Sequence, residues 1–80
     1  MSNTSTVSDE LRLLVSEVLR IDVAHIDNAV PLVDYGLDSL RAISLVVAIE
    51  QRFTVLISDD DLEQMHTIGQ ITEYLLRVQQ

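Results

Sequence analysis

The chain has 80 residues, which is enough for one small domain but not for a second core. Hydrophobic residues make up 48% of the sequence, so we expect a folded core rather than a disordered chain. Its 13 acidic and 5 basic residues give a net charge of -8, which disfavours binding to nucleic acid or to anionic membrane surfaces. The absence of cysteine excludes disulfides, thiolate metal sites and cysteine nucleophiles.

The first predicted helix spans residues 7–20, because apolar side chains recur there at helical spacing. The members of this stripe are Leu11, Leu14, Val15, Val18 and Leu19. Thr6 or Ser8 is expected to cap the helix. The small polar residues 1–6 are expected to form a flexible tail, so residues 7–80 would make up the single domain.

Residues 21–38 show no sustained helical period, and Pro31 and Gly36 would interrupt a helix. The segment nevertheless contains many apolar residues, unlike a polar linker. We therefore expect an ordered crossover that is held down by its own apolar side chains. A short strand at Val30–Val33 is the alternative, although no second strand is evident to pair with it.

Residues 39–53 give the strongest helical signal, and their apolar side chains form two stripes. The stripe that is expected to face the core consists of Ala42, Leu45, Val46, Ile49 and Phe53. The second stripe, on a different face, consists of Leu40, Ile43 and Val47. Because polar residues occupy the remaining arc, the helix is not buried all round, and the second stripe is a candidate docking surface.

Two capping patterns predict two further helices. Ser58 precedes three aspartates, and Asp61 lies at the third position after it, which predicts a short helix. Thr67 and Gln70 have the same spacing and predict a final helix over residues 68–78. Together the elements predict an all-α fold, a four-helix bundle of three longer helices and one short helix, with a long ordered loop between helices one and two.

Most of the chemically reactive side chains have ordinary explanations. His25 and His66 are far apart and have no carboxylate at ligand spacing, so we interpret them as surface or cap residues rather than metal ligands. The run Asp59–Asp61 lacks the spaced ligands and central glycine of a calcium loop, which favours helix capping. No acid–base pair or activated nucleophile is evident, so we do not expect an enzyme.

The segment Asp34–Leu40 stands out from this background. Gly36 supports a tight turn just before Ser39, whose hydroxyl would lie at the start of the two-striped helix. A hydroxyl at that place is exposed and near unpaired backbone N–H groups, which favour a phosphodiester anion. The simpler interpretation is that Asp38 or Ser39 only caps the helix.

Residues 36–40, Gly-Leu-Asp-Ser-Leu, resemble the modification motif of the acyl and peptidyl carrier protein family. The resemblance continues through residues 45–53 and covers the chain from about Leu11 to Leu76. It implies that Ser39 is esterified with 4′-phosphopantetheine from coenzyme A by a phosphopantetheinyl transferase. In the family, this transferase recognises the aspartate before the serine.

The resemblance also implies a non-catalytic protein that carries acyl, polyketide or aminoacyl cargo as thioesters. Its partners would be a loading enzyme and a synthase, transferase or thioesterase of the pathway. We expect a monomer. We also expect it to be cytoplasmic, because the N-terminus lacks the features of a signal peptide and no apolar run approaches the length of a membrane span. The residues expected to dock partners are Asp38, Leu40, Arg41, Ile43, Ser44 and Val47.

The helix after the serine departs from the family pattern. Carriers that resemble this one often present several carboxylates there, but residues 39–53 contain Arg41 and Arg52 against Glu50 alone. We therefore expect docking to rely on the apolar stripe, with dedicated partners rather than the enzymes of fatty-acid synthesis. Residues 38–43, Asp-Ser-Leu-Arg-Ala-Ile, look more like carriers of polyketide or nonribosomal peptide pathways. A peptidyl carrier and an unmodified helical interaction module are the alternatives.

A cargo pocket is a further hypothesis. Small carriers of this family can fold the acyl chain between their helices. The walls of such a pocket would be Val46, Ile49, Phe53, Ile57 and Leu62. The same residues are also ordinary core candidates, so the sequence leaves both interpretations open.

Overall fold

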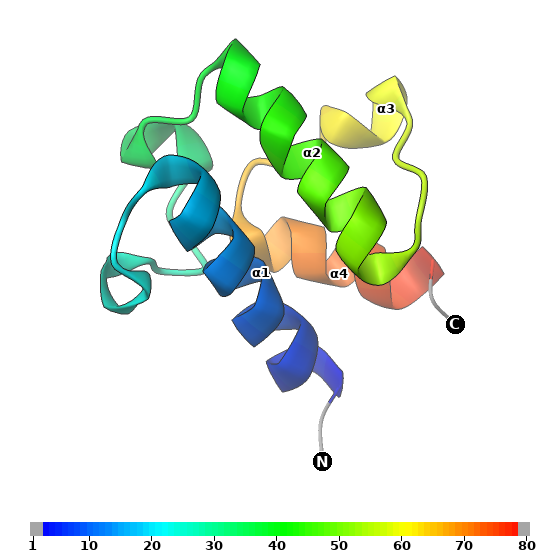
Figure 1. The fold of residues 1–80 in the computed structure, drawn as a ribbon. Helices are drawn as coiled ribbons and strands as arrows, with labels where there is room; N and C mark the ends of the chain where they lie inside the picture. Colours follow the sequence, from blue (N-terminus) through cyan, green and yellow to red (C-terminus); the bar gives the residue numbers. More distant parts are fainter. Residues whose placement is uncertain (1–2, 79–80) are drawn as a thin grey trace.

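The computed structural model describes residues 3–78 and consists of helices joined by loops (Figure 1). The α-helices are α1 (Asn3–Leu19), α2 (Ser39–Phe53), α3 (Asp59–Leu62) and α4 (Ile68–Val78). Helix α1 packs against both α2 and α4. No strand occurs within residues 3–78, and the predicted all-α fold of three longer helices and one short helix is confirmed.

Helix α1 begins earlier than the sequence predicts. Its helical backbone starts at Asn3 rather than at residue 7, so residues 3–6 belong to the helix and not to a tail. The other two residues of the expected tail lie outside the described residues. Val7 is buried on the same face as Leu11, so the apolar stripe of α1 begins one turn before Leu11.

Ser8 makes a tertiary contact instead of capping α1. It is buried, and its Oγ accepts a hydrogen bond of 2.6 Å from Asn28 Nδ2. The backbone oxygen of Asn28 in turn accepts a hydrogen bond of 3.0 Å from Gly69 N. A Cβ at Gly69 would lie 3.4 Å from that oxygen, so the glycine allows the close approach. One loop residue thus joins α1 to the start of α4.

The crossover between α1 and α2 contains two short 3-10 helices, η1 (Val23–His25) and η2 (Leu32–Tyr35). Leu32 is buried in the core, and its backbone N–H donates a hydrogen bond of 2.8 Å to His66 O. The expected ordered crossover is therefore confirmed. The alternative strand at Val30–Val33 is wrong, because the 3-10 helix η2 begins within this segment and no strand occurs within residues 3–78.

The later helices begin where the capping patterns predict. Ser58 Oγ accepts a hydrogen bond of 3.2 Å from Asp61 N at the start of α3. At the start of α4, Thr67 Oγ1 accepts from Gln70 N at 3.1 Å, and Gln70 Oε1 accepts from Thr67 N at 3.1 Å. These reciprocal bonds form a complete capping box, which depends only on neighbouring residues.

The core lies between α1, α2 and α4, and the first stripe of α2 faces it as predicted. Leu45, Ile49 and Phe53 are buried, while Ala42 and Val46 are half-buried. The side chains of the core that are less than 2% exposed are Leu11, Leu32, Ile49, Ile68, Ile71, Leu75 and Val15. Contributions from every longer helix and from the crossover fix the position of α2 and therefore of its N-terminus.

Candidate functional site

A glycine turn sets the point at which α2 can begin. Helix η2 ends at Gly36, whose φ of 95° and ψ of 16° lie in the left-handed region. Gly36 N donates to Val33 O at 3.1 Å, and Leu37 N donates to Leu32 O at 3.3 Å. This pair of bonds is the Schellman pattern that ends helices. The predicted turn at Gly36 is confirmed, and Asp38 follows it two residues later at the start of α2.

Asp38 caps α2. Its backbone is extended, with φ of -122° and ψ of -177°, and its Oδ1 accepts a hydrogen bond of 2.8 Å from Arg41 N. Its carbonyl accepts the first intrahelical bond, from Ala42 N at 2.8 Å. The carboxylate also lies at the positive end of the helix dipole. Of the two capping candidates, the structure therefore uses Asp38, and Ser39 is left out of the cap.

Ser39 is the first residue of α2, and its side chain is exposed. In the part of the chain that the structure describes, no residue forms a hydrogen bond or an ion pair with its hydroxyl. The backbone N–H groups of Ser39 and Leu40 occupy the first helical positions, where an α-helix supplies no acceptor. An exposed hydroxyl beside such donors fits a covalently attached phosphodiester.

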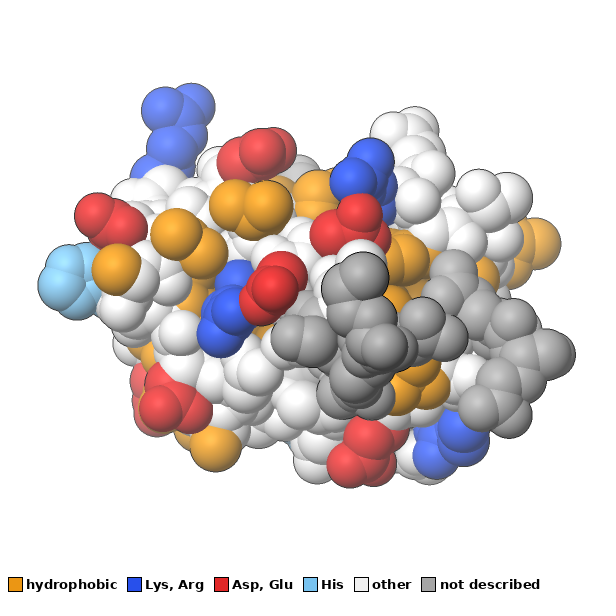
Figure 2. Space-filling view, turned by 90° about the horizontal axis from the view of Figure 1, so that it is seen from below, with side chains coloured by type: hydrophobic (Ala, Val, Ile, Leu, Met, Phe, Trp, Pro, Cys, Tyr) orange, Lys and Arg blue, Asp and Glu red, His pale blue; other side chains and the backbone are white. Residues whose placement is uncertain are grey.

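The second apolar stripe of α2 is exposed, as the sequence predicts. The exposed fractions of its side chains are 75% for Leu40, 63% for Ile43 and 44% for Val47. Arg41 and Ser44, which flank the stripe, are exposed as well. By contrast, the face of the molecule seen from below mixes acidic, basic and apolar side chains (Figure 2). The N-terminal half of α2 therefore presents a continuous apolar surface that starts next to Ser39.

Two of the three charged side chains of α2 are engaged within the protein. Glu50 Oε2 accepts a hydrogen bond of 2.9 Å from a backbone N–H of the α2–α3 loop. Arg52 Nη2 lies 2.6 Å from Glu10 Oε1 and joins α2 to α1. Arg41 Nη1 reaches only the carbonyl of Gly36, at 3.5 Å, among the described residues. Arg41 is therefore the charge that α2 can offer to a partner.

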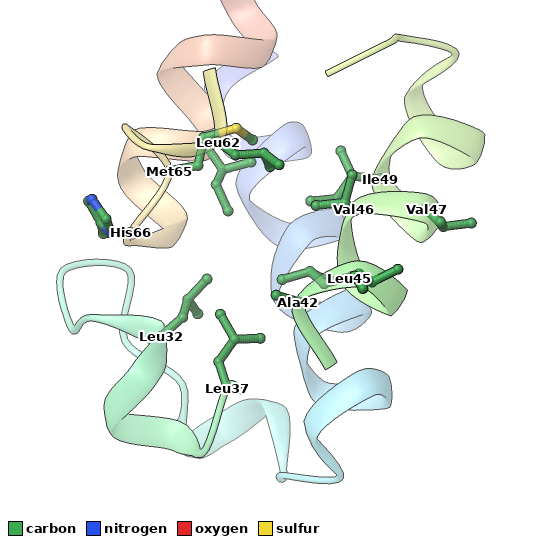
Figure 3. A pocket seen from close by; sticks show the side chains of 12 residues that line it. Leu32, Leu37, Ala42, Leu45, Val46, Val47, Ile49, Leu62, Met65 and His66 are labelled. Atoms are coloured by element: carbon green, nitrogen blue, oxygen red, sulfur yellow. The ribbon is translucent and has the colours of Figure 1, made fainter. Parts of the chain in front are cut away.

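An apolar cavity of about 320 Å³ lies beside α2 (Figure 3). Val46, Ile49 and Leu62 line it, as expected for a cargo pocket. Phe53 and Ile57 do not belong to its lining, so the expectation was wrong for these two. The reason is their position: Phe53 ends α2 and Ile57 lies beyond it in the next loop, whereas the cavity follows the middle of the helix.

Several lining residues were not anticipated from the sequence. Leu32 and Leu37 reach the cavity from the crossover, and Met65 and His66 reach it from the segment before α4 (Figure 3). The hydrophobicity of Leu32, Leu37 and Met65 was visible in the sequence, but only the tertiary packing brings these segments opposite α2. A partial signal was the glycine turn, because the residue after a Schellman glycine often packs on the helix that the turn ends.

The other candidate groups do not assemble into a site. His25 and His66 are both exposed, in agreement with the interpretation as surface residues. Within residues 3–78, no three side chains of the metal-ligating types lie close enough to hold an ion. None of the described helices is long and apolar enough to cross a membrane.

Residues 9–75 match the family described as "Phosphopantetheine attachment site", and the chain belongs to this family. The chain is 35% identical over 72 residues to the acyl carrier protein of Buchnera aphidicola, across 89% of this chain and 91% of that protein. It is 32% identical over 76 residues to the acyl carrier protein of Thermotoga maritima, across 94% of each.

Solved structures show the same fold. A free-standing peptidyl carrier protein from an uncharacterized secondary metabolic pathway of Acinetobacter baumannii has a TM-score of 0.86 and 28% identity, over 96% of each chain. The HMG-ACPI domain from the CurA module of Lyngbya majuscula also has a TM-score of 0.86, over 95% of this chain and 77% of that chain. Its 22% identity supports the likeness of fold alone.

The chain therefore has the function of an acyl or peptidyl carrier protein, with covalently attached 4′-phosphopantetheine as its cofactor. Proteins of this family are generally non-catalytic and act with phosphopantetheinyl transferases and pathway enzymes. The resemblance found in residues 36–40 is confirmed, and the alternative of an interaction module outside this family is not supported.

The Asp38 cap gives a first prediction. Asp38→Ala removes the acceptor of Arg41 N–H and is expected to lower the free energy of unfolding by about 0.5–2 kcal/mol, measured by urea denaturation. Asp38→Asn keeps a capping oxygen and should lose much less. Asp34→Ala, at a nearby exposed acid in η2, is the control and should change stability by less than about 0.5 kcal/mol. Equal losses for Asp34→Ala and Asp38→Ala would contradict the capping role.

Proposed function

We propose that Ser39 is the attachment point of the 4′-phosphopantetheine, in a single carrier domain that acts as a monomer in the cytoplasm. The observation that supports this most strongly is the exposed hydroxyl of Ser39 at the first position of α2, outside the Asp38 cap. Ser44 is also exposed, but it lies in the interior of α2, where the backbone N–H groups are already bonded. Of these two serines of α2, Ser39 alone combines exposure with free helix-terminal donors.

The attachment reaction needs coenzyme A and a phosphopantetheinyl transferase. Ser39 Oγ forms a new P–O bond, the bond between the two linked phosphates of coenzyme A breaks, and the nucleotide portion leaves with the second phosphate. The hydroxyl proton passes to a base of the transferase, because none of the described residues forms a hydrogen bond with the hydroxyl of Ser39. Once attached, the group supplies a thiol that holds the cargo as a thioester.

Asp38, the residue before Ser39, has two proposed roles. Asp38 caps the start of α2, where its carboxylate accepts a hydrogen bond from Arg41 N. We propose that the transferase also recognises this exposed carboxylate. Its negative charge does not favour the nearby phosphodiester, since like charges repel. The helix N-terminus, by contrast, stabilises an exposed anion such as the phosphodiester by about 0.3–1 kcal/mol.

Partner docking is proposed to use the exposed stripe of Leu40, Ile43 and Val47, together with Asp38, Arg41 and Ser44. The exposed fractions of the stripe support this, since its side chains can be buried only by another molecule. Arg41 adds a positive charge to the surface. The partners would be the transferase, a loading enzyme and a synthase, transferase or thioesterase of one pathway.

The cargo class is proposed to be an acyl, polyketide or aminoacyl group of a specialised pathway. The scarcity of carboxylates on α2 supports dedicated partners, because only Glu50 is acidic there and its side chain is bonded to the backbone. The similarity to a free-standing peptidyl carrier of a secondary metabolic pathway also supports a specialised pathway. A peptidyl or aminoacyl carrier of nonribosomal peptide synthesis is the alternative within this class.

Intact mass spectrometry tests the attachment point. Incubation with coenzyme A and a broad-specificity transferase is expected to add one phosphopantetheine to the unmodified protein. Ser39→Ala should abolish the gain completely, because the nucleophilic oxygen is missing. Ser44→Ala is the matched control on the same helix and should gain the group as the wild type does. A mass gain in Ser39→Ala, or none in the wild type, would overturn the proposal.

The docking surface gives a further prediction for the rate of the same transferase reaction. Leu40→Ala removes most of a side chain that is 75% exposed, so the fold should persist while kcat/KM falls about tenfold, from a loss of about 1.5 kcal/mol of apolar burial in the complex. Leu13→Ala, at a leucine of α1 that is 54% exposed, is the control and should leave kcat/KM unchanged. Equal rates for Leu40→Ala and wild type would contradict docking through the stripe.

A further inference from the structure

The loop between α2 and α3, which Figure 1 shows in yellow-green, presents one large apolar side chain to solvent. Leu56 is 89% exposed, the largest value among the large hydrophobic side chains that the structure describes. Its neighbours Val55 and Ile57 are half-buried and pack against the core. The loop therefore alternates inward and outward side chains, as an extended segment does, and Leu56 is the one that points outward.

Two side chains from different helices hold the peptide group that joins Leu56 to Ile57. The carbonyl of this group, on Leu56, accepts a hydrogen bond of 3.3 Å from Tyr74 Oη of α4. The N–H of the same group, on Ile57, donates a hydrogen bond of 2.9 Å to Glu50 Oε2 of α2. Because a peptide group is planar, bonds at both of its ends restrict its rotation and thereby the direction of the Leu56 side chain.

The chain also turns sharply just before Leu56. Thr54, the C-cap of α2, has φ of 55° and ψ of 53°, in the left-handed region that β-branched residues rarely adopt. Such conformations persist where the surrounding structure holds them, and they are common at functional sites. Here the next residue is held as well, since Val55 N donates a hydrogen bond of 3.2 Å to Glu50 O. The exposure of Leu56 therefore belongs to a loop that is fixed by several bonds.

Leu56 borders a hollow of about 410 Å³ that adjoins the exposed stripe of α2. The residues that line this hollow are Val47, Glu50, Gln51, Thr54, Val55 and Leu56. Val47 belongs to both the stripe and the hollow, and Figure 3 shows its side chain on the side of α2 away from Leu32 and Leu37. The one ionisable side chain of the lining, Glu50, is already bonded to the loop backbone. The hollow is therefore continuous with the stripe and suited to an uncharged, apolar group.

We propose that Leu56 is an anchor that inserts into an apolar pocket of the enzyme that loads or removes the cargo, and that Glu50 and Tyr74 are positioning residues for this anchor. The inference rests on the proposed carrier function and on docking through the stripe. The pocket of the enzyme accepts the leucine side chain, and an apolar side chain at its rim fills the hollow beside Val47. An aliphatic anchor held in place and seated in a pocket is an effective centre for a binding interface.

The position of Leu56 favours a cargo enzyme over the transferase. Ser39 begins α2 and Leu56 lies just beyond its end, and the 15 residues of the helix span about 22 Å. The transferase reacts at Ser39 itself, so its active site must cover the start of the helix. A cargo enzyme reacts at the far end of a flexible arm, so its docking surface can extend to the other end of α2. An interface of standard size covers about 800 Å² of each partner, a patch about 30 Å across, which is enough to include both the stripe and Leu56.

Photocrosslinking in the native host identifies the enzyme. The photoreactive amino acid p-benzoylphenylalanine replaces Leu56, Ile43 of the stripe or, as the control, Leu13, an exposed leucine of α1 outside both surfaces. We expect the proteins labelled at Leu56 and at Ile43 to crosslink to the same enzyme, identified by mass spectrometry as one that forms or cleaves thioesters, and the control to give no such product. A product from Ile43 but none from Leu56, or a product of another class from Leu56, would overturn the proposal.

The affinity for the identified enzyme measures the contribution of the anchor. In the phosphopantetheinylated protein, Leu56→Ala should raise the Kd about tenfold, as the loss of a buried leucine side chain would, whereas Leu13→Ala should not change it. Because Leu56 is exposed, the melting temperature should stay that of the wild type. The same variant tests the choice of partner: an equal, about tenfold loss in kcat/KM of the transferase would place Leu56 in the transferase interface and overturn the proposal.

A double-mutant cycle tests the positioning role. Glu50→Ala removes the acceptor of Ile57 N–H and should raise the Kd about threefold, whereas Glu50→Gln keeps an acceptor oxygen and should restore most of the affinity. Tyr74→Phe should act in the same way through the carbonyl of Leu56. In a Leu56→Ala background neither substitution should change the Kd further, because the anchor that they position is absent. Equal effects with and without the Leu56 side chain would overturn the positioning role.

The outcomes separate this inference from the proposed function. If no phosphopantetheine is attached to Ser39, the proposed function fails and the inference falls with it. If the arm is attached and the crosslink from Ile43 forms, but Leu56→Ala binds the enzyme as tightly as the wild type does, the carrier role stands and the inference is overturned.

Discussion

The hydrogen bond from Arg41 N to Asp38 Oδ1 is the interaction on which the site depends. A helix N-terminus needs a side chain to accept one of its free N–H groups, and serine and aspartate are both good at this. Because Asp38 is the residue that caps α2, the hydroxyl of Ser39 stays exposed at the first helical position and is available for esterification. If Ser39 were the cap, its oxygen would be turned back onto the helix backbone.

Helix α2 combines three functions on different faces. One face packs in the core through Leu45 and Ile49, and the N-terminus presents Ser39. The remaining apolar face is exposed, yet Ile43 and Val47 also line the cavity. Under the proposed docking mode, a partner on this face would touch two side chains that line the cavity.

The sequence predicted the elements that depend on local hydrogen bonds and missed those that depend on packing. The starts of α2, α3 and α4 follow from Asp38, Ser58 and the Thr67–Gln70 box, which need only neighbouring residues. The start of α1 was placed too late, because Ser8 looked like a cap but bonds to Asn28, 20 positions away. The cavity lining was predicted only in part for the same reason, since its crossover and α4 sides are brought to α2 by tertiary structure.

The most direct test of the account is to locate the modification on the protein purified from its own host. Fragmentation mass spectrometry of the peptide that contains residues 34–41 would assign the group to one side chain. The account predicts 4′-phosphopantetheine on Ser39, since that hydroxyl lies exposed at the start of α2 and outside the Asp38 cap. A group found on another serine or threonine, with Ser39 unmodified, would contradict it.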